Sequence, residues 1–481
     1  MYPQVLAFGS FENMNQSNYN YLFGDKRIER RGEQLLSSLF RAGYSSIQSI
    51  SNSRAEQKGY YRFLRNDKVQ EELLIKEMVD RCGKVSAGNV VLSIQDTTEI
   101  NLYNHNGRIA YDESLGPLND RERGLGFKLH PSLVIDACTC YPYGYSAIKL
   151  WSRPHEKQEV SHYDQQRMDV SEKETQIWID SNEQTYSSLS QAKAVVIVQD
   201  REGDFYEQFA MAPDDDKFFL LVRSNHNRRL EEGQRLWDYI DELPECGNYS
   251  TTISYQLNGQ SRKQREATMA VKIGKVKLKK PHKKAASMPK SSVELTVIEA
   301  REVNTDFEDP ILWRLYTTWP VDNFEQAHMV IEWYRCRWFI EEVFKVLKKE
   351  CFNIEGSELE SGWSVRKLSL MLLDTIIKLF QMSIAYGMEE GECPETATMF
   401  DDEEIACLDS INKKVQGKTE KQSNPFPPQK LAWAFWILAR LGGWKGYASQ
   451  RKPGFNTLIN GIDKFYTIYQ GYSLQKDVGT Q

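Results

Sequence analysis

The pattern of hydrophobic and polar positions predicts helices at both ends of the chain. Apolar residues recur at helical spacing from Lys26 to Phe40, and Asp25, directly before this stretch, is a residue type that commonly caps a helix. Further short helices are expected as far as about residue 80. A final helical region is predicted over about 428–472.

Runs of β-branched and other apolar residues between these ends predict strands. The first four runs are 89–95, 133–139, 145–151 and 194–199, and a helix is expected over 170–189. From about 217 to 320 the pattern predicts mainly strands, with one short helix near 236–241. Strands that alternate with helices and then continue without them indicate an α/β layer with a β-rich insertion.

Two longer helices are predicted beyond the strands. The first runs from about Asn323 to Lys349 and the second from about Val365 to Met388. The most apolar stretch of the chain, Leu368 to Phe380, is interrupted by Asp374 and Lys378. It therefore predicts a buried helix and not a membrane span.

Composition and charge exclude several classes of protein. A chain of 481 residues with 40% hydrophobic and 27% charged residues is long and apolar enough for roughly three folded domains, which excludes disordered and fibrous proteins. The net charge is −6, so the whole chain is not basic, but residues 1–70 hold ten basic and six acidic residues. Residues 272–290 are basic and predict a solvated hairpin loop, whereas 389–409 hold nine acids and no base and predict an exposed linker or solvated face.

Other composition signals concern compartment and cofactors. The eight cysteines form no CxxC pair, which favours a reducing compartment. Met1 to Asn18 has neither the basic nor the apolar region of a secretion signal, so we expect a cytoplasmic protein with no membrane partner. No glycine-rich phosphate loop is present, so no nucleotide cofactor is expected. The histidines form no metal or nucleophile motif, and His130 is expected to be a buried structural residue.

Two aspartates are candidates for chemistry because each ends a predicted buried strand. Asp96 follows VVLSIQ and Asp200 follows VVIVQ. Open α/β sheets place their ligands at the carboxyl ends of strands. Each residue taken alone is also compatible with a simple turn or cap.

A third acidic candidate lies in the helix predicted over 323–349. On a regular helix Tyr334, Arg337, Glu341 and Lys348 would share one narrow stripe. This stripe is compatible with an ordinary solvated face. It is also what a metal-binding carboxylate needs beside a phosphodiester, because Mg²⁺ prefers carboxylate oxygen and basic groups hold phosphates.

Several ordered motifs carry a resemblance to a known family. They are DTT at Asp96, DREGD at Asp200, and Tyr334, Arg337, Glu341 and Lys348 at the spacing Y-x2-R-x3-E-x6-K. With them the chain resembles the bacterial DDE cut-and-paste transposases of the insertion-sequence-four family over nearly its whole length. The resemblance implies a ribonuclease-H-like fold in which Asp96, Asp200 and Glu341 are catalytic and bind Mg²⁺, for which Mn²⁺ can substitute.

The resemblance also implies residues that contact DNA. Tyr334, Arg337 and Lys348 would hold the transposon end near the cut, with Arg223 as a further basic contact. Trp313 would stack with a flipped base, although a core aromatic residue is an equally good interpretation from the sequence. In the N-terminal helices, the implied end-binding residues are Arg27, Arg31, Tyr61, Arg62 and Arg65. Isolated arginines on small helices are otherwise often only solvated.

The resulting hypothesis is a DNA transposase with a ribonuclease-H-like α/β core, a β-rich insertion and helical domains on both sides. The expected domains are an end-binding domain at 1–75, a catalytic domain at 76–385 with its insertion at about 217–320, and a C-terminal dimerisation domain at 386–481. Its expected partners are transposon-end DNA, target DNA and a second copy of the chain, and it would associate with the nucleoid when acting. The alternatives are a catalytically inactive DNA-binding relative and, more remotely, a glycoside hydrolase with paired carboxylates.

Overall fold

The chain folds into a mixed α/β structure with two compact units. The computed structural model describes residues 19–105, 107–110, 112–118, 124–155, 168–255, 263–281, 290–305, 310–417, 419–447 and 450–479. One unit, called here the helical unit, takes in 1–87, 97–156 and 341–481, and the other, the sheet unit, takes in 88–96 and 157–340. The division into three functional domains expected from the sequence is a different partition and stays a prediction.

The sheet unit begins with three parallel strands. These are β1 (Val90–Gln95), β6 (Ala194–Gln199) and β7 (Phe218–Arg223), with β6 paired to both others. Their residues are almost all buried, as expected for parallel strands covered on both faces. The helices between them are α5 (Gln176–Ser188), the short 3-10 helix η3 (Arg201–Gly203) and α6 (Tyr206–Met211).

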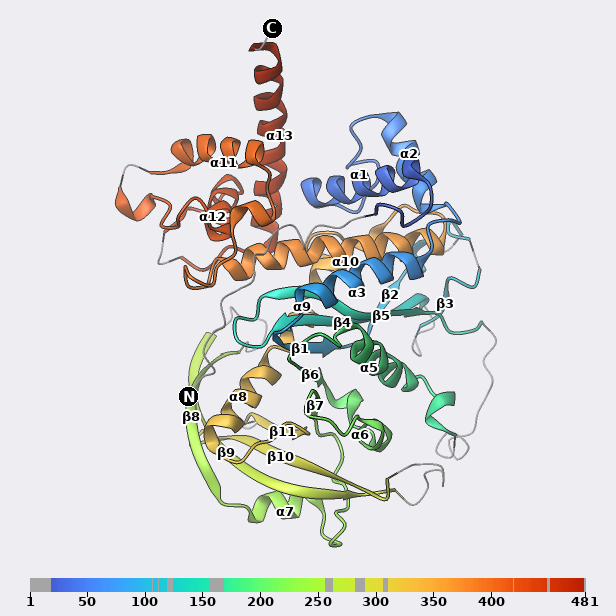
Figure 1. Cartoon of the computed structure of the whole chain (residues 1–481), viewed down its shortest axis with the longest axis vertical. Helices are drawn as coiled ribbons and strands as arrows, with labels where there is room; N and C mark the ends of the chain where they lie inside the picture. The colour runs from blue at the N-terminus through green and yellow to red at the C-terminus, as the bar shows by residue number, and fades with distance from the viewer. Residues whose placement is uncertain are drawn as a thin grey trace. The chain divides into compact units, whose positions relative to one another are not determined.

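The sheet of this unit continues with antiparallel strands. Beyond β7 the order is β11 (Leu312–Thr317), β10 (Ser292–Val303), β9 (Lys263–Lys279) and β8 (Glu245–Tyr255). Figure 1 shows β8, β9 and β10 as long strands that curve together, in yellow-green to yellow. Helices α7 (Leu236–Glu242) and α8 (Phe324–Arg335) pack against β9. The β-rich region expected over about 217–320 is therefore an extension of the parallel strands.

The helical unit has its own strands and a central helix. Strand β4 (Leu125–Asp136) pairs antiparallel with β2 (Thr98–Asn101), β3 (Gly116–Pro117) and β5 (Pro142–Trp151). Helix α10 (Gly362–Ala385) packs against β5 and against α1 (Lys26–Ala42), α2 (Arg54–Leu64) and α3 (Glu71–Val85). Beyond α10 the unit is helical, with α11 (Asp402–Val415), α12 (Leu431–Leu441) and α13 (Phe455–Gly479).

Helix α10 is long and apolar enough to pass a test for a membrane-spanning helix on length and composition alone. Nearly all of its residues are nevertheless buried within the helical unit. The prediction of a buried helix over Leu368 to Phe380 is confirmed.

Most predicted elements are confirmed, one is wrong, and two are confirmed only in part. The single helix predicted over 323–349 is divided into α8, a turn at Cys336 and Arg337, α9 (Trp338–Lys345) and a π-helical turn η4 (Val346–Glu350). The basic stretch 272–290 lies in a hairpin, as predicted, because β9 and β10 are antiparallel and pair Lys279 with Ser292, but its residues up to Lys279 are strand and not loop. Residues 282–289 lie outside the described residues. The acids of the acidic stretch are largely exposed, as predicted, but its second half is helical: Asp401 caps α11 and three more acids occupy its first turn, where negative charge is favourable at the positive end of the helix dipole.

Candidate functional site

The two strand-end aspartates occupy equivalent positions in the sheet unit. Strands β1 and β6 are parallel and adjacent, and their register pairs Ile94 with Val198. Asp96 and Asp200 both follow that pair by two residues. Because neighbouring strands lie about 4.8 Å apart, two carboxylates leave the same edge of the sheet side by side.

The surroundings of Asp200 separate two roles within the DREGD motif. One carboxylate oxygen of Asp200 accepts a hydrogen bond of 2.8 Å from the backbone N–H of Glu202, so Asp200 caps η3. The side chain of Asp204 is fully buried and accepts from the backbone N–H groups of Asn225 and His226, at 2.6 and 3.0 Å, and from the guanidinium of Arg228. Asp204 is therefore a structural carboxylate, whereas the carboxylate of Asp200 remains partly exposed.

Arg337 lies against the first aspartate. Its Nη1 is 3.3 Å from Oδ2 of Asp96, and both side chains are largely buried, at 13% and 16% exposed. Arg337 lies in the turn between α8 and α9. The backbone hydrogen bonds of this turn join residues three positions apart, such as the N–H of Arg337 and the carbonyl of Tyr334. The structure thus brings together two predicted site residues that are far apart along the chain.

Trp338 lies beside the candidate site and was not among the residues predicted from the sequence. It follows Arg337, and the guanidinium carbon lies 5.7 Å from its ring centroid. Its side chain is 61% exposed, which is unusual for so large an aromatic residue. A tryptophan within an amphipathic helix pattern is expected to be buried in the core. Its exposure follows from the interruption of the helix, which the sequence pattern does not show.

Two further predicted residues, Arg223 and Trp313, lie beside Tyr334. Arg223, at the end of β7, lies near the Tyr334 hydroxyl, and the ring of Trp313 meets the ring of Tyr334 edge to face at 5.7 Å. Burial raises the pKa of Tyr334, the charges of Arg337 and Arg223 oppose this shift, and Asp200 adds to it. Burial also lowers the pKa of Arg223. Tyr334 is therefore a neutral hydrogen-bonding group that lies near both arginines and Asp200.

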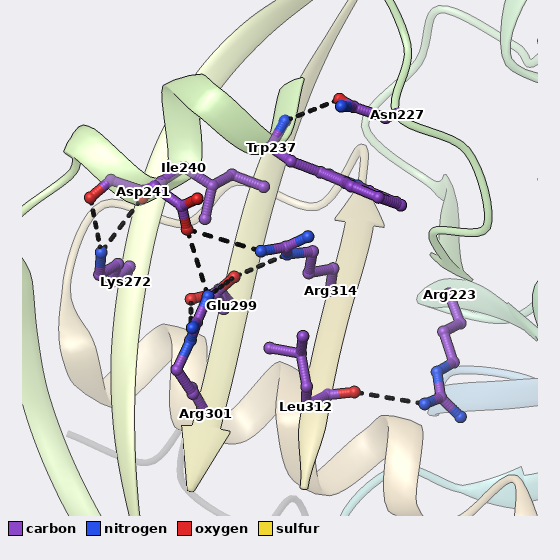
Figure 2. A network of polar contacts seen from close by, with 10 residues as sticks. All are labelled: Arg223, Asn227, Trp237, Ile240, Asp241, Lys272, Glu299, Arg301, Leu312 and Arg314. Atoms are coloured by element: carbon purple, nitrogen blue, oxygen red, sulfur yellow. Dashed lines mark hydrogen bonds and ion pairs between the residues drawn. The ribbon is translucent and has the colours of Figure 1, made fainter. Parts of the chain in front are cut away.

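A polar network fixes the strand that carries Trp313. Figure 2 shows Glu299, which is buried on β10, paired with Arg301 at 3.0 Å and with Arg314 on β11 at 2.7 Å. Lys272 donates to the carbonyl groups of Ile240 and Asp241 and so holds the end of α7 against β9.

Because side chains alternate along a strand, Trp313 faces away from Arg314 and this network, toward α8. In the same view Arg223 donates to the backbone carbonyl of Leu312 at 3.3 Å. Trp313 is half-buried, so one part of its ring remains accessible.

The third predicted carboxylate belongs to the helical unit, whereas Asp96 and Asp200 belong to the sheet unit. Glu341 lies in the first turn of α9, is partly exposed, and is the first residue of the helical unit in this part of the chain. The expectation that the four motif residues from Tyr334 to Lys348 share one face of a regular helix is wrong. The turn before Trp338 and the π turn after Lys345 change the angle between successive residues. Among the described residues no group of three or more His, Cys, Asp or Glu side chains is arranged to hold a metal ion. The three-carboxylate metal site therefore stays a prediction.

Lys348 has partners of its own within the helical unit. Its Nζ donates to the carbonyl of Glu99 at 2.7 Å and lies 3.3 Å from the carboxylate of Glu355. It sits in the π-helical turn η4, a feature that often marks functional sites. Its predicted role in DNA binding would require exchange of at least one of these contacts.

Four of the predicted end-binding residues lie on the first two helices of the helical unit, and the fifth, Arg65, follows α2 directly. Asp25 caps α1 by accepting from the backbone N–H of Arg27 at 2.9 Å, as the sequence predicts. Arg27, Arg62 and Arg65 are exposed, whereas Arg31 is half-buried. The guanidinium carbons of Arg31 and Arg65 lie 5.9 and 6.0 Å from the rings of Tyr60 and Tyr61, respectively. Arg65 is also paired with Glu360 at 2.9 Å.

The prediction for His130 is confirmed. Its side chain is fully buried in β4, and burial, reinforced by the nearby charge of Lys149, lowers its pKa to about 3. The ring Nδ1 lies 2.8 Å from the hydroxyl of Thr97, the residue that follows Asp96. His130 is therefore a neutral structural residue and not a general base at physiological pH.

Comparison with known protein families gives a match in the N-terminal part of the chain. Residues 16–69 match the family model described as Transposase DNA-binding. This segment contains α1 and α2 and with them all five predicted end-binding residues. The match supports DNA as a partner and a role in transposition for this chain.

Proposed function

We propose that this protein is a cut-and-paste DNA transposase of the insertion-sequence-four type, similar to the Tn-five transposase, with a ribonuclease-H-like catalytic core. In this proposal it acts in the bacterial cytoplasm, binds transposon ends as a homodimer and inserts them into target DNA. The finer assignments rest on the motif resemblance, and the N-terminal transposase DNA-binding segment supports the general class.

One observation carries the catalytic part of the proposal. Asp96 and Asp200 leave adjacent parallel strands in register, and the same unit places two arginines and a buried tyrosine hydroxyl beside them. Carboxylates at one sheet edge suit a hard divalent cation, and guanidinium groups suit phosphate oxygens. A phosphodiester is a substrate whose cleavage uses both a divalent cation and guanidinium groups.

The residues would divide the work as follows. Asp96, Asp200 and Glu341 would hold Mg²⁺, which when bound supplies an activated water and charge stabilisation for displacement at phosphorus. Arg223, Tyr334 and Lys348 would fix the phosphates of the scissile strand. Arg337 would exchange Asp96 for a phosphate oxygen, since both are anionic acceptors for a guanidinium. Trp313 and the exposed Trp338 offer aromatic faces on which an unpaired base could stack.

Repeated displacements at one site would account for the full reaction. Water first cuts one strand at each end, the freed 3′ hydroxyl attacks the opposite strand to give a hairpin, and water reopens the hairpin. The exposed 3′ ends then attack target DNA. Each step is the same phosphoryl displacement, so a single set of side chains serves all of them.

The test compares cutting with binding. The full chain would be incubated with its end DNA and Mg²⁺, and the variants Asp96→Asn, Asp200→Asn and Glu341→Gln would be compared with the wild type. We expect each to lose cleavage by roughly 10³-fold or more while binding the end DNA normally, because charge-stabilising groups act mainly in the transition state. Cutting at the wild-type rate by any variant removes that residue from the mechanism.

Matched controls are available beside two of the carboxylates. Glu202 and Glu342 are exposed neighbours of the site residues Asp200 and Glu341, respectively. Glu202→Gln and Glu342→Gln change the charge by the same amount and should leave cleavage close to wild type. An equal loss in these controls would indicate a general charge effect.

A DNA-binding protein without cleavage is the second candidate. The ion pair between Asp96 and Arg337 favours this candidate, because Arg337 is paired with a carboxylate that a metal ion would need as a ligand. The same experiment decides between the two, since this candidate binds end DNA and does not cut it under any divalent-ion condition.

A further inference from the structure

A buried amide cluster lies directly behind the two strand-end aspartates. Gln95 and Gln199 are the last residues of β1 and β6, and each immediately precedes one of the aspartates. Both are fully buried. Glutamine is rarely buried, so two of them side by side at this place need a physical reason.

The two side chains are bonded to each other across the strands. Nε2 of Gln199 donates to Oε1 of Gln95 at 2.8 Å. The amide oxygen of Asn182 on α5 accepts from both, at 3.0 Å from Gln95 and 3.3 Å from Gln199. These three side chains, which we call the amide clamp, cross-link β1, β6 and the helix that covers them.

The clamp also reaches the turn that contains the second aspartate. A Cβ atom added to Gly203, in η3, would overlap the amide oxygen of Gln199. Gly203 is therefore needed where η3 packs on Gln199, and η3 is the helix that Asp200 caps. Gln199 consequently constrains Asp200 both through the backbone and through this packing.

A positional constraint is useful at this edge for an electrostatic reason. Two carboxylates side by side repel each other until a cation lies between them. A neutral amide pair resists their separation without adding charge, and movement of either strand would leave buried amide groups without hydrogen bonds, which is costly. Apolar side chains at these positions would fill the same space but would not fix the register of the strand ends.

We propose that Gln95 and Gln199 are positioning residues that set the spacing of Asp96 and Asp200 for binding a divalent cation. This inference rests on the proposed function of the aspartates. It assigns the glutamines no contact with DNA or metal. Their effect is transmitted through the adjoining backbone.

The experiment measures metal binding apart from cleavage. Gln95→Met and Gln199→Met keep the length of the side chain and remove its hydrogen bonds. Binding of Mn²⁺ to the DNA-free full chain would be followed by electron paramagnetic resonance, and the Mg²⁺ concentration for half-maximal end cleavage would be measured in parallel. Loss of a group that orients metal ligands commonly weakens metal affinity by roughly 10- to 100-fold, and we expect each variant to fall in this range in both measurements. Affinity for end DNA without divalent ions should not change.

A matched control removes a buried glutamine elsewhere. Gln381 on α10 is buried and donates to the carbonyl of Pro142 at 3.0 Å. Gln381→Met should lower stability in the same manner as the clamp variants but leave both metal measurements at the wild-type value. If Gln381→Met weakens Mn²⁺ binding as much as the clamp variants do, the effect is general and the proposal is overturned.

Two further variants keep the test decisive. The double variant Gln95→Met/Gln199→Met should weaken Mn²⁺ binding by less than the two single effects combined, because both single variants already lose the shared Gln95–Gln199 hydrogen bond. If the methionine variants fail to fold, Gln199→Asn retains an amide but shortens its reach, and it should give the same loss of metal affinity. Wild-type Mn²⁺ affinity in folded clamp variants overturns the proposal.

The proposed function can fail separately. Asp200→Asn serves as the reference: if it leaves Mn²⁺ affinity and cleavage unchanged, the assignment of the carboxylates is wrong. If Asp200→Asn weakens both while the clamp variants bind Mn²⁺ as the wild type does, only the role of the amide clamp is wrong.

Discussion

At the scale of single residues, the run from Asp200 to Asp204 shows how neighbouring carboxylates acquire different tasks. Asp204 is enclosed by Arg228 and two backbone N–H groups, so its charge is compensated inside the protein. Asp200 accepts one backbone hydrogen bond as a cap and is partly exposed at the sheet edge. The first arrangement stabilises the fold, and the second suits a side chain that must receive a ligand.

This difference predicts opposite effects of the same substitution. Asp204→Asn leaves the buried charge of Arg228 without its partner and should lower the free energy of unfolding by about 3–5 kcal/mol. Asp200→Asn should change it by less than about 1 kcal/mol, because asparagine caps a helix as well as aspartate does. Urea unfolding of the two variants measures both values, and similar losses would contradict the assignment.

The sequence predicts the candidate site only in part at this scale. The strand-end position of Asp96 is visible because the apolar run before it is short and β-branched. Its pairing with Arg337 depends on residues 241 positions apart, and no local pattern contains that information. The amide clamp was missed for a related reason: glutamine at a strand end looks solvated until the packing of α5 against it is known.

At the scale of secondary-structure elements, two glycines flank α1 in similar backbone conformations and different surroundings. Gly24 precedes the capping residue with φ +66°, and Gly43 ends the helix with φ +67°. A Cβ atom at Gly24 would meet no atom, whereas at Gly43 it would overlap the side chain of Ile459 on α13. The left-handed conformation disfavours alanine at both sites, but only Gly43 is also crowded.

Alanine at these two glycines should therefore separate strain from crowding. Gly24→Ala should lower the free energy of unfolding by about 1–2 kcal/mol, the cost of a left-handed alanine. Gly43→Ala should lose a further ~1–3 kcal/mol, because the methyl group forces α1 and α13 to adjust. Thermal and urea unfolding provide the comparison. Equal losses would show that the end of α1 is not tightly packed on α13.

Elements were predictable where a local pattern decides them. The apolar runs at β1 and β6 and the capped start of α1 are decided by adjacent residues, and all three are confirmed. The break at Cys336 was not predictable, because no Gly or Pro marks it. The start of α11 was not predicted, because a run of acids indicated only an exposed linker or a solvated face. The Asp401 and Glu404 capping box shows that they stabilise a helix terminus instead.

At the scale of the whole molecule, the location of charge matters more than its sum. The chain carries a net charge of −6, yet its transposase DNA-binding segment presents exposed arginines on α1 and α2. At 0.1 M salt, charges more than about 10 Å apart are largely screened from each other. An anionic protein can thus bind DNA through a local basic surface.

The salt dependence of binding tests this view. Each phosphate contact contributes about −0.9 to the slope of log affinity against log salt concentration on duplex DNA. Arg62→Gln should therefore make the slope for end DNA less steep by about 0.9, measured by fluorescence anisotropy without divalent ions. Lys413→Gln is the matched control, since Lys413 is exposed on α11, is paired with Asp409 at 2.7 Å, and changes the net charge by the same amount. The control should keep the wild-type slope, because its charge is already compensated locally and lies outside the DNA-binding segment. If the two variants change the slope equally, the net charge of the chain governs binding and the local basic surface does not.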